Sequence, residues 1–495
     1  MFISEEVFRL THFSIIVAIA VLGFKVISLE DAIDKLSRPV DHLSKRSDQT
    51  SLCNDSKLPV VWIHGKSTNY DYLVHVKNVF EQMGFRVLTG DTTEKFDVWW
   101  NHEFPFQNSA LLSKVKSLTH RQLLNHVPGS GYITSKVTLA STPLSRGLPR
   151  AFALPQQKDE YLEYARNNPE VLWVQKSNAH RGVKVMKPKD VDFSKQDTFV
   201  QQFIDRVLTI DGKKFDIGIY TVVTSVSPLR VYIYDNDMLL RFCSKSYKPF
   251  DANDVDKYVV GDDYTPIWEM PSFESYFNKQ QLNSKESFRA YCADGKCDFD
   301  KIWSQIRQTI SEVFVLNNER MRNLLRNYPY KRSFFEMVRF DFIVDEQMNL
   351  WLMEVNMSPN LSSGHFKQNA KLYEQVLLNL FSLVGIQSEY KKRSVNVNQL
   401  DISDRDLFVD LKECYNGSCT GCPRNNTENC GLCFECIDKN FMIDLRAAQR
   451  EHLERRQMKR VVPSHWTSDA KLTRQDLLQN RWFTEMCKKD NSYCD

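Results

Sequence analysis

The chain has 495 residues, of which 42% are hydrophobic and 12% aromatic, enough to fill a sizeable core in roughly two to four domains. Its 65 Lys and Arg residues nearly balance its 62 Asp and Glu residues. The overall charge therefore gives no argument for a nucleic-acid partner, and we expect none. Any acidic partner must be bound by a local patch.

An apolar run, FSIIVAIAVLGF, occupies residues 13–24. At about 1.5 Å per residue it falls short of a bilayer core of roughly 30 Å, so its length favours a signal peptide, although a snorkelling Lys25 could extend it into a signal anchor. We predict a signal peptide or signal anchor at 1–28, with a buried helix as the alternative, and a polar linker at 29–57. This predicts an endomembrane or secretory location. The basic residues after the run would instead leave the body of a retained anchor in the cytoplasm, near the cytoskeleton.

Six of the twelve cysteines lie in 414–436 with the spacing C-x4-C-x2-C-x7-C-x2-C-x2-C. In an exported chain this pattern indicates disulfides, whereas in a cytosolic chain it indicates a zinc module. Four of these cysteines have zinc-like spacing: Cys419, Cys422, Cys430 and Cys433. N-glycosylation sequons, which suggest a glycoprotein, begin at Asn54, Asn360, Asn416 and Asn425.

The folded part is predicted to begin with a buried strand at 58–65 (LPVVWIHG), followed by an amphipathic helix that ends before Gly84. Further strands, FRVLTG and FDVWWN, complete a pattern that predicts a parallel α/β lobe, which we place at 58–165. Later in the chain, strand patterns are followed by a long helix at about 300–327, two strands joined as a hairpin, and a last helix ending at Gly385. The predicted strands read VLWVQK, TFVQQFI, KFDIGIYTVVTSV, LRVYIYD, FFEMVRFDFIV and MNLWLMEVN.

The hairpin carries three oxygen-bearing side chains near one end. A loop at about 345–349 places Asp341 opposite Glu354, and Asn356, two residues further on, shares the face of Glu354. Two carboxylates and an amide suit Mg²⁺ shared with substrate phosphates. The alternative is a solvated hairpin edge on which the two acids pair with Arg339 or with lysines.

The hairpin sequence F-D-F-I-V-D-x4-L-W-L-M-E-V-N-M-S-P-N resembles the closing motif of the tubulin tyrosine ligase-like family of ATP-grasp amino-acid ligases. The resemblance continues upstream through LLNHVPG, WVQKSNAHRGVKV, FVQQFID, KKFDIGIYTVV and LLRF, in the family's order, over roughly residues 60–385. It implies a mixed α/β (α+β) ATP-grasp fold, with the central and C-terminal lobes at 166–388. A Cys-rich and basic helical extension at 389–495 lies beyond it.

The resemblance also implies site residues. Lys176 matches a catalytic lysine that contacts the ATP phosphates, and Arg241 matches a catalytic arginine that faces the phosphates or the acyl-phosphate. Arg181 and Gly182 fall in the loop that covers the phosphates. Without the resemblance, the position of Lys176 favours a surface lysine at the end of a strand. The expected ATP-binding set is Lys176, Arg181, Gly182, Gln202, Phe203, Ile204, Lys214 and Asp216. Of these, Gln202, Phe203 and Ile204 match the hinge that contacts adenine. The expected magnesium ligands are Asp341, Glu354 and Asn356.

Three departures from the family pattern bear on catalysis. Gly218 stands where the family pattern KFD-x-R has an arginine that helps hold the acyl-phosphate or substrate carboxylate. The family's His-Leu-Thr-Asn stretch after LLRF is replaced by KYVVGDDYTPIWEM, and Lys184 replaces the second glycine of the R-G-x-G loop. Losing such an arginine can cost on the order of 10² to 10³ in rate.

The resemblance implies an ATP- and Mg²⁺-dependent ligase that adds glutamate to glutamate side chains of tubulin tails through an acyl-phosphate. The alternatives are a nucleotide-binding pseudoenzyme that serves as a membrane-tethered interaction module, and a ligase with a lumenal, non-tubulin acceptor. The segment 445–460 predicts a basic helix that could attract an acidic tail, or else a solvated helix laced with Glu451 and Glu454 pairs.

Overall fold

The structure, a computed structural model, describes residues 58–65, 71–177, 183–196, 198–386, 404–422, 430–464 and 472–494. The proposed signal segment and linker therefore lie outside the described residues, as do Arg181 and Gly182. Within the described ranges, no helix combines the length and the apolar character needed to cross a membrane.

The first sheet is parallel, with strand order β2-β1-β3-β4, as the alternating pattern predicts. Trp62 of β1 and Trp99 of β3 stack inside it with ring centroids 4.6 Å apart. The apolar face predicted for the first helix is buried against the sheet. The elements are β1 (Val60–His64), α2 (Val74–Gln82), β2 (Arg86–Thr89), β3 (Val98–Asn101), α3 (Ser109–Lys116) and β4 (Leu123–Leu124).

A small antiparallel sheet follows, with strand order β5-β8-β6-β7. It is joined to the first sheet by two short helices and carries one helix of its own, whose Tyr161 packs edge-on against Trp173. The elements are α4 (Gly131–Thr134), α5 (Lys136–Ala140), β5 (Ala151–Leu154), α6 (Lys158–Asn167), β6 (Trp173–Lys176), β7 (Val185–Met186) and β8 (Thr198–Gln202).

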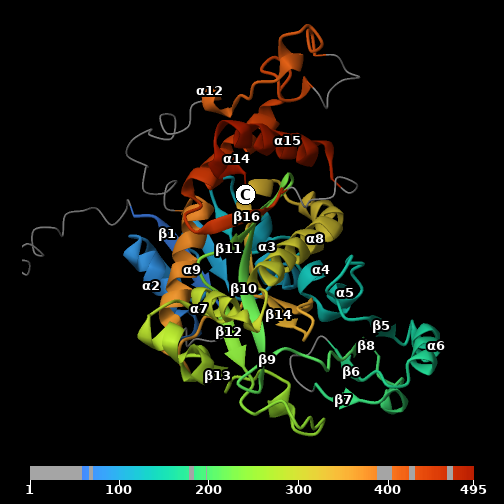
Figure 1. Cartoon of the computed structure of the whole chain (residues 1–495). Coiled ribbons are helices and arrows are strands. Elements are labelled where there is room, and N and C mark those ends of the chain that lie inside the picture. The colour runs from blue at the N-terminus through green and yellow to red at the C-terminus, as the bar shows by residue number, and fades with distance from the viewer. Residues whose placement is uncertain are drawn as a thin grey trace, which may run out of the picture. The chain divides into compact units, whose positions relative to one another are not determined.

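The largest sheet has eight strands and is built around β10, a strand of 14 residues that pairs with β11, β12 and β14 (Figure 1). The predicted hairpin is confirmed as β14 and β15, with Asp341 paired to Glu354 and a bulge directly after that pair. The strands are β9 (Thr209–Ile210), β10 (Lys213–Val226), β11 (Leu229–Tyr234), β12 (Leu239–Phe242), β13 (Thr265–Pro266), β14 (Glu336–Val344), β15 (Leu350–Met357) and β16 (Met458–Val462).

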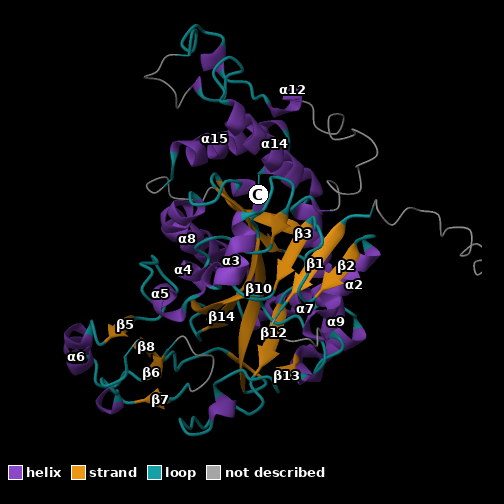
Figure 2. Cartoon of the chain, turned by 180° about the vertical axis from the view of Figure 1, so that it is seen from behind, coloured by secondary structure: helices purple, strands orange, loops and turns teal. Residues whose placement is uncertain are grey.

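Two long helices cover this sheet (Figure 2), and α7 (Ser284–Tyr291) packs near the start of the first, where Phe288 contacts Phe299. The predicted long helix is α8 (Phe299–Leu325), whose residues at spacings of four and three, Ile306, Ile310 and Val313, are buried. The last predicted helix is α9 (Asn369–Leu383). Gly385 follows it with φ of +77°, a conformation that glycine adopts without steric cost and that commonly ends helices.

The extension after α9 packs on this body. It comprises α12 (Asp404–Leu407), α14 (Lys439–Glu454), β16 and α15 (Arg474–Lys489), and Trp482 and Phe441 lie in its own small core. The prediction of one helix over 445–460 is wrong at its end. The helix stops at Glu454, Arg456 turns the chain with φ of +50°, and β16 pairs with β11 as an edge strand.

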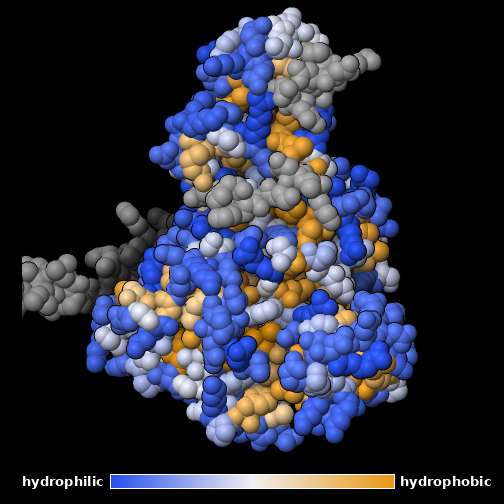
Figure 3. All heavy atoms as spheres, turned by 45° about the vertical axis from the view of Figure 1, so that its right-hand side comes forward, coloured by the Kyte–Doolittle hydropathy of each residue, from blue (hydrophilic) through white to orange (hydrophobic). Residues whose placement is uncertain are grey.

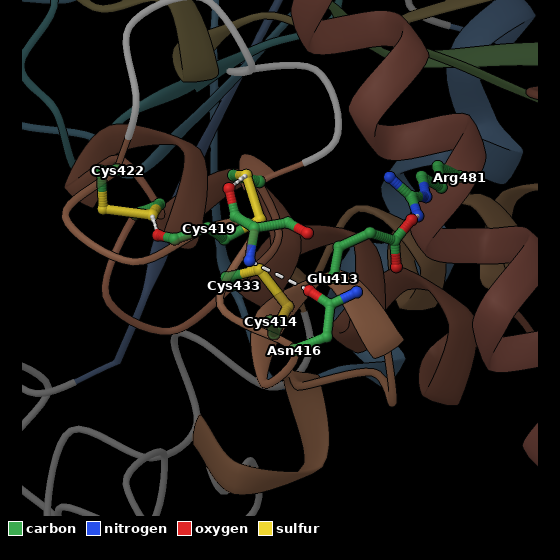
Figure 4. Close-up of a disulfide and its surroundings, with 10 residues drawn as sticks. Glu413, Cys414, Asn416, Cys419, Cys422, Cys433 and Arg481 are labelled. Carbon is green, nitrogen blue, oxygen red and sulfur yellow. Dashed lines mark hydrogen bonds and ion pairs between the residues drawn. A yellow bond between two sulfur atoms is a disulfide. The ribbon is translucent and has the colours of Figure 1, made fainter.

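Ten cysteines form disulfides, and among the described residues only Cys243, which is buried, is a free thiol. Within 414–436 the structure adopts the disulfide alternative and not the zinc one, because all six cysteines are paired with one another (Figure 4). The pairs are Cys292–Cys297, Cys414–Cys433, Cys419–Cys430, Cys422–Cys436 and Cys487–Cys494. Beside the cluster, Arg481 of α15 donates to Glu413 at 2.6 Å.

The described residues from Pro59 onward form one compact unit. Hydrophilic residues cover most of the face shown in Figure 3, with apolar ones visible between them, as expected when the long apolar side chains fill the layers between sheets and helices. The division into lobes at 58–165, 166–388 and 389–495 stays a proposal.

Candidate nucleotide and metal site

The three side chains expected to bind a metal converge. Asn356 Nδ2 donates to Asp341 Oδ2 at 2.8 Å and to Glu354 Oε1 at 2.9 Å, so one amide group touches both carboxylates. The strand period of two and the register of the hairpin place all three on one face. Within the described ranges no group of three or more His, Cys, Asp and Glu residues could hold a metal, and the third donor expected at this site is the side chain of Asn356.

Four charged side chains alternate in sign across the strands next to this group. Arg241 on β12 binds Asp216 on β10 at two points, with Nε–Oδ1 2.9 Å and Nη2–Oδ2 2.7 Å, and its Nη2 also donates to Asp341 Oδ2 at 3.1 Å. Arg339 binds Asp341 at 2.6 Å and 2.8 Å. The ion pairs of the solvated-edge alternative are thus present, but Asp341 is only 2% exposed, so they lie in a buried array and not on a solvated edge.

A small pocket lies between β15 and the antiparallel sheet. Lys136, Lys176, Gln201 and Glu354 line it together with apolar side chains such as Met353. Lys136 Nζ lies 3.2 Å from Glu354 Oε2, and Lys176 Nζ donates to Gln201 Oε1 at 2.9 Å. Two ammonium groups therefore stand beside the carboxylate expected to hold a metal, an arrangement suited to phosphate.

The surroundings shift the pKa values of two of these groups. Burial lowers the pKa of Lys176 to about 8, against the opposing charge of Glu354. Burial works against the charged form of Glu354, but Lys136, Asn356 and Arg339 outweigh it and hold its pKa at about 2. Glu354 therefore stays ionised through the neutral range, as a metal ligand must.

The residues expected to contact the adenine of a nucleotide lie at the edge of the same region. Phe203 and Ile204 are each 9% exposed and pack in an apolar cluster with residues of the small sheet and of the hairpin. The backbone N–H groups of Gln202 and Phe203 already donate to the carbonyls of Arg150 and Leu172 at 2.8 Å. Adenine recognition by Gln202, Phe203 and Ile204 stays a prediction.

Lys214 and Asp216 do not pair with each other. Lys214 Nζ donates to the carbonyl of Tyr258 at 2.8 Å and lies 5.5 Å from the ring centre of Phe203, whereas Asp216 binds Arg241. Burial lowers the pKa of Lys214. The segment that replaces the family's His-Leu-Thr-Asn stretch provides β13, whose Pro266 pairs with Arg241.

Three residues of the site were not found from the sequence. Lys136 lies in a short helix far from the hairpin in the chain, Gln201 is one of many polar strand residues, and Arg339 was noted only as a partner for acids. For Arg339 the sequence does carry a signal, because the strand period of two puts it on the same face of β14 as Asp341. Lys136 and Gln201 have no such signal.

The residues fit Mg²⁺ and ATP phosphates. The side-chain amide of Asn356 lies between the two carboxylates. Rotating this amide by half a turn would place its oxygen at the same point, giving three hard oxygen donors. Lys176 and Lys136 supply positive charge on the pocket side. The fit rests on this donor set and its convergence.

Fold and site together define a mixed α/β protein whose central sheet gathers acidic, amide and basic groups beside a small second sheet, an arrangement suited to nucleotide phosphates. The model of the tubulin-tyrosine ligase family matches residues 114–394. The chain belongs to this family of ligases, and its fold is of the ATP-grasp type.

Three relatives show how far the similarity extends. The chain is 45% identical over 475 residues to the probable tubulin polyglutamylase ttll-15 of Caenorhabditis elegans, covering 93% of this chain and 92% of that protein. It is 27% identical to the tubulin polyglutamylase TTLL6 of Homo sapiens, over 64% of this chain and 37% of that protein. It is 25% identical to the human tubulin polyglutamylase TTLL7, over 65% of this chain and 38% of that protein. The chain thus spans well under half the length of the two human proteins.

Proposed function

We propose that the protein is an ATP- and Mg²⁺-dependent ligase that adds glutamate to glutamate side chains of an acidic protein tail, with tubulin as the first acceptor to test. The observation that carries the proposal is the convergence of Asp341, Glu354 and Asn356 beside the Lys176 pocket. The names of the relatives, which are tubulin polyglutamylases, support the donor and acceptor.

In this proposal Asp341, Glu354 and Asn356 hold Mg²⁺, which neutralises phosphate charge when bound. Lys176 and Lys136 bind phosphate oxygens on the pocket side. Arg241, fixed by Asp216, directs its guanidinium to the anion that forms on the acceptor side.

The reaction we propose has two steps. An oxygen of the acceptor carboxylate bonds to the terminal phosphorus of ATP while the bond to ADP breaks, giving an acyl-phosphate. The amine of free glutamate then bonds to the acyl carbon, inorganic phosphate leaves, and a proton from the amine passes to solvent. No side-chain nucleophile takes part, so the protein contributes positioning and charge.

The acceptor would meet the protein through positive charge. Arg446 and Arg456 of the extension are exposed, whereas Arg460 is buried and donates to the carbonyls of Pro463 and Tyr493. The basic segment therefore offers an acidic tail only part of the charge that its sequence carries, and we propose it as a contributor to acceptor binding.

The test is incubation of purified protein with ATP, Mg²⁺, labelled glutamate and microtubules. We expect label on tubulin, lost with Glu354→Gln and kept with Glu319→Gln, a matched change of an exposed acid on α8. ATP binding without incorporation would support the pseudoenzyme alternative instead.

A lumenal, non-tubulin acceptor is the second candidate, favoured by the five disulfides, because such bonds persist in oxidising compartments. Asn360 and Asn416 of the sequons are exposed, as glycosylation requires. An endomembrane or secretory location, with membrane attachment through 1–28 if that segment is retained, belongs to this proposal. A cytoplasmic location belongs to the tubulin proposal. Loss of mass after glycosidase treatment of the cellular protein would favour the lumenal site.

A further inference from the structure

Gly218 and Arg339 occupy one small volume on the central sheet. Gly218 lies directly opposite Asp341 across β10 and β14, and Arg339 lies two residues before Asp341 on the same face of β14. A Cβ atom at position 218 would stand 3.0 Å from Arg339 Cδ, 3.3 Å from Arg339 Nε and 3.3 Å from Asp341 Oδ1. The space that a side chain at 218 would enter is therefore filled by the arginine of the neighbouring strand.

Arg339 uses this position to hold Asp341. Nε and Nη2 of Arg339 donate to the two oxygens of Asp341, and the side chains are 7% and 3% exposed. A two-point bond fixes the plane of a carboxylate, which a single ammonium contact does not. The free rotation that would turn Asp341 away from Asn356 and Glu354 is thereby removed.

We propose that Arg339 is a positioning residue that holds Asp341, and that it brings from the adjacent strand the guanidinium that the family pattern has at position 218. The inference rests on the proposed function and explains how the site tolerates Gly218. Residues diagonal across an antiparallel pair lie about 7–8 Å apart, within reach of a long side chain. An arginine at either position can thus serve the same carboxylate, but the two cannot occupy the space together.

The array also needs this charge. Four largely buried side chains alternate in charge, and each acid therefore has a basic neighbour. They are Asp216, Arg241, Asp341 and Arg339. Removing Arg339 leaves two buried carboxylates sharing the single guanidinium of Arg241. Uncompensated buried charge is costly, and the array would rearrange around Arg241.

The test is a swap of the two residues. Arg339→Gly and Gly218→Arg should each lower the ligation rate about 10²-fold, the first by releasing Asp341 and the second by crowding it. The double variant Gly218→Arg/Arg339→Gly should return to within about tenfold of the wild-type rate. A double variant no more active than the product of the two single effects would overturn the proposal, as would an Arg339→Gly variant with the wild-type rate.

A second measurement separates positioning from support of the fold. The Mg²⁺ concentration that half-saturates binding of an ATP analogue should rise at least tenfold in Arg339→Gln and Arg339→Lys, since neither provides the two-point bond. In the double variant Gly218→Arg/Arg339→Gly this Mg²⁺ concentration should return toward the wild-type value. An unchanged Mg²⁺ requirement in folded Arg339→Gln protein would overturn the inference. If the wild-type protein ligates nothing, the proposed function fails, while the swap is still decided by this binding measurement.

Discussion

Arg230 on β11 and Glu451 on α14 form a two-point ion pair at 2.8 Å and 2.9 Å in which both side chains are only 4% exposed. Glu451 also accepts hydrogen bonds from Thr224 and Tyr232, and Arg230 donates to Gln479 of α15. Both long helices of the extension are therefore tied to the central sheet. Glu451, which the sequence suggested for a solvated helix, therefore forms a buried ion pair inside the fold.

Glu451→Gln should lower the free energy of unfolding by about 3–5 kcal/mol, because it leaves Arg230 charged and buried without its partner. Denaturant unfolding followed by tryptophan fluorescence measures the loss. Glu435→Gln, at an exposed position of the same extension, should change the stability by no more than about 0.5 kcal/mol. Equal effects of the two changes would show that the pair does not anchor the extension.

ATP affinity should fall about tenfold between pH 7 and pH 9. With the pKa of Lys176 at about 8, its protonated fraction drops by about that factor over this range. Calorimetric titration with an ATP analogue measures the effect, and Lys176→Arg, which stays charged, should bind with little dependence on pH. A flat profile in the wild-type protein would remove Lys176 from the phosphate site.

The lowered pKa of Lys176 also makes the stability depend on pH, and the stability should increase with pH whereas the ATP affinity decreases. The folded pKa of Lys176 lies below its ordinary value of 10.5, so between these values the unfolded chain binds more protons. The free energy of unfolding should therefore rise with pH from about 8 to 10.5 through this group, and Lys176→Met should lack that rise. Thermal unfolding of the two proteins across this range compares them directly.

Lys136→Met should weaken ATP binding about tenfold or more, since it removes one of two ammonium groups lining the pocket and a charge-assisted contact is worth about 1.5–3 kcal/mol. Lys189→Met changes an exposed lysine after β7, outside the pocket, and is the matched control that should bind ATP normally. Identical affinities for wild type and Lys136→Met would place the nucleotide elsewhere.

Reductant should destabilise the extension, and a zinc chelator should not. Replacing Cys419 and Cys430 by serine opens a bridge with a sequence separation of 11 and should cost about 3 kcal/mol. Thiol alkylation with mass spectrometry should find the six cysteines of 414–436 protected until reduction. Bound zinc released by acid, together with six reactive thiols, would contradict the pairing.

Local periodicity determined much of this protein. The hairpin, the parallel first lobe, α8 and α9 follow from strand and helix periods and from Gly385, because backbone geometry alone sets which residues share a face. The period of two likewise gathers Asp341, Glu354 and Asn356, and the resemblance supplied Lys176 and Arg241.

Only the tertiary structure decided how distant segments meet. Lys136 of α5 reaches Glu354 of β15, and Arg339 fills the space over Gly218. The predicted basic helix ends early, because the residues that follow it form β16 at the edge of the sheet. Each depends on the register and order of strands far apart in the chain. That information is held by packing and buried charge, which act in space and leave no periodic mark along a single sequence.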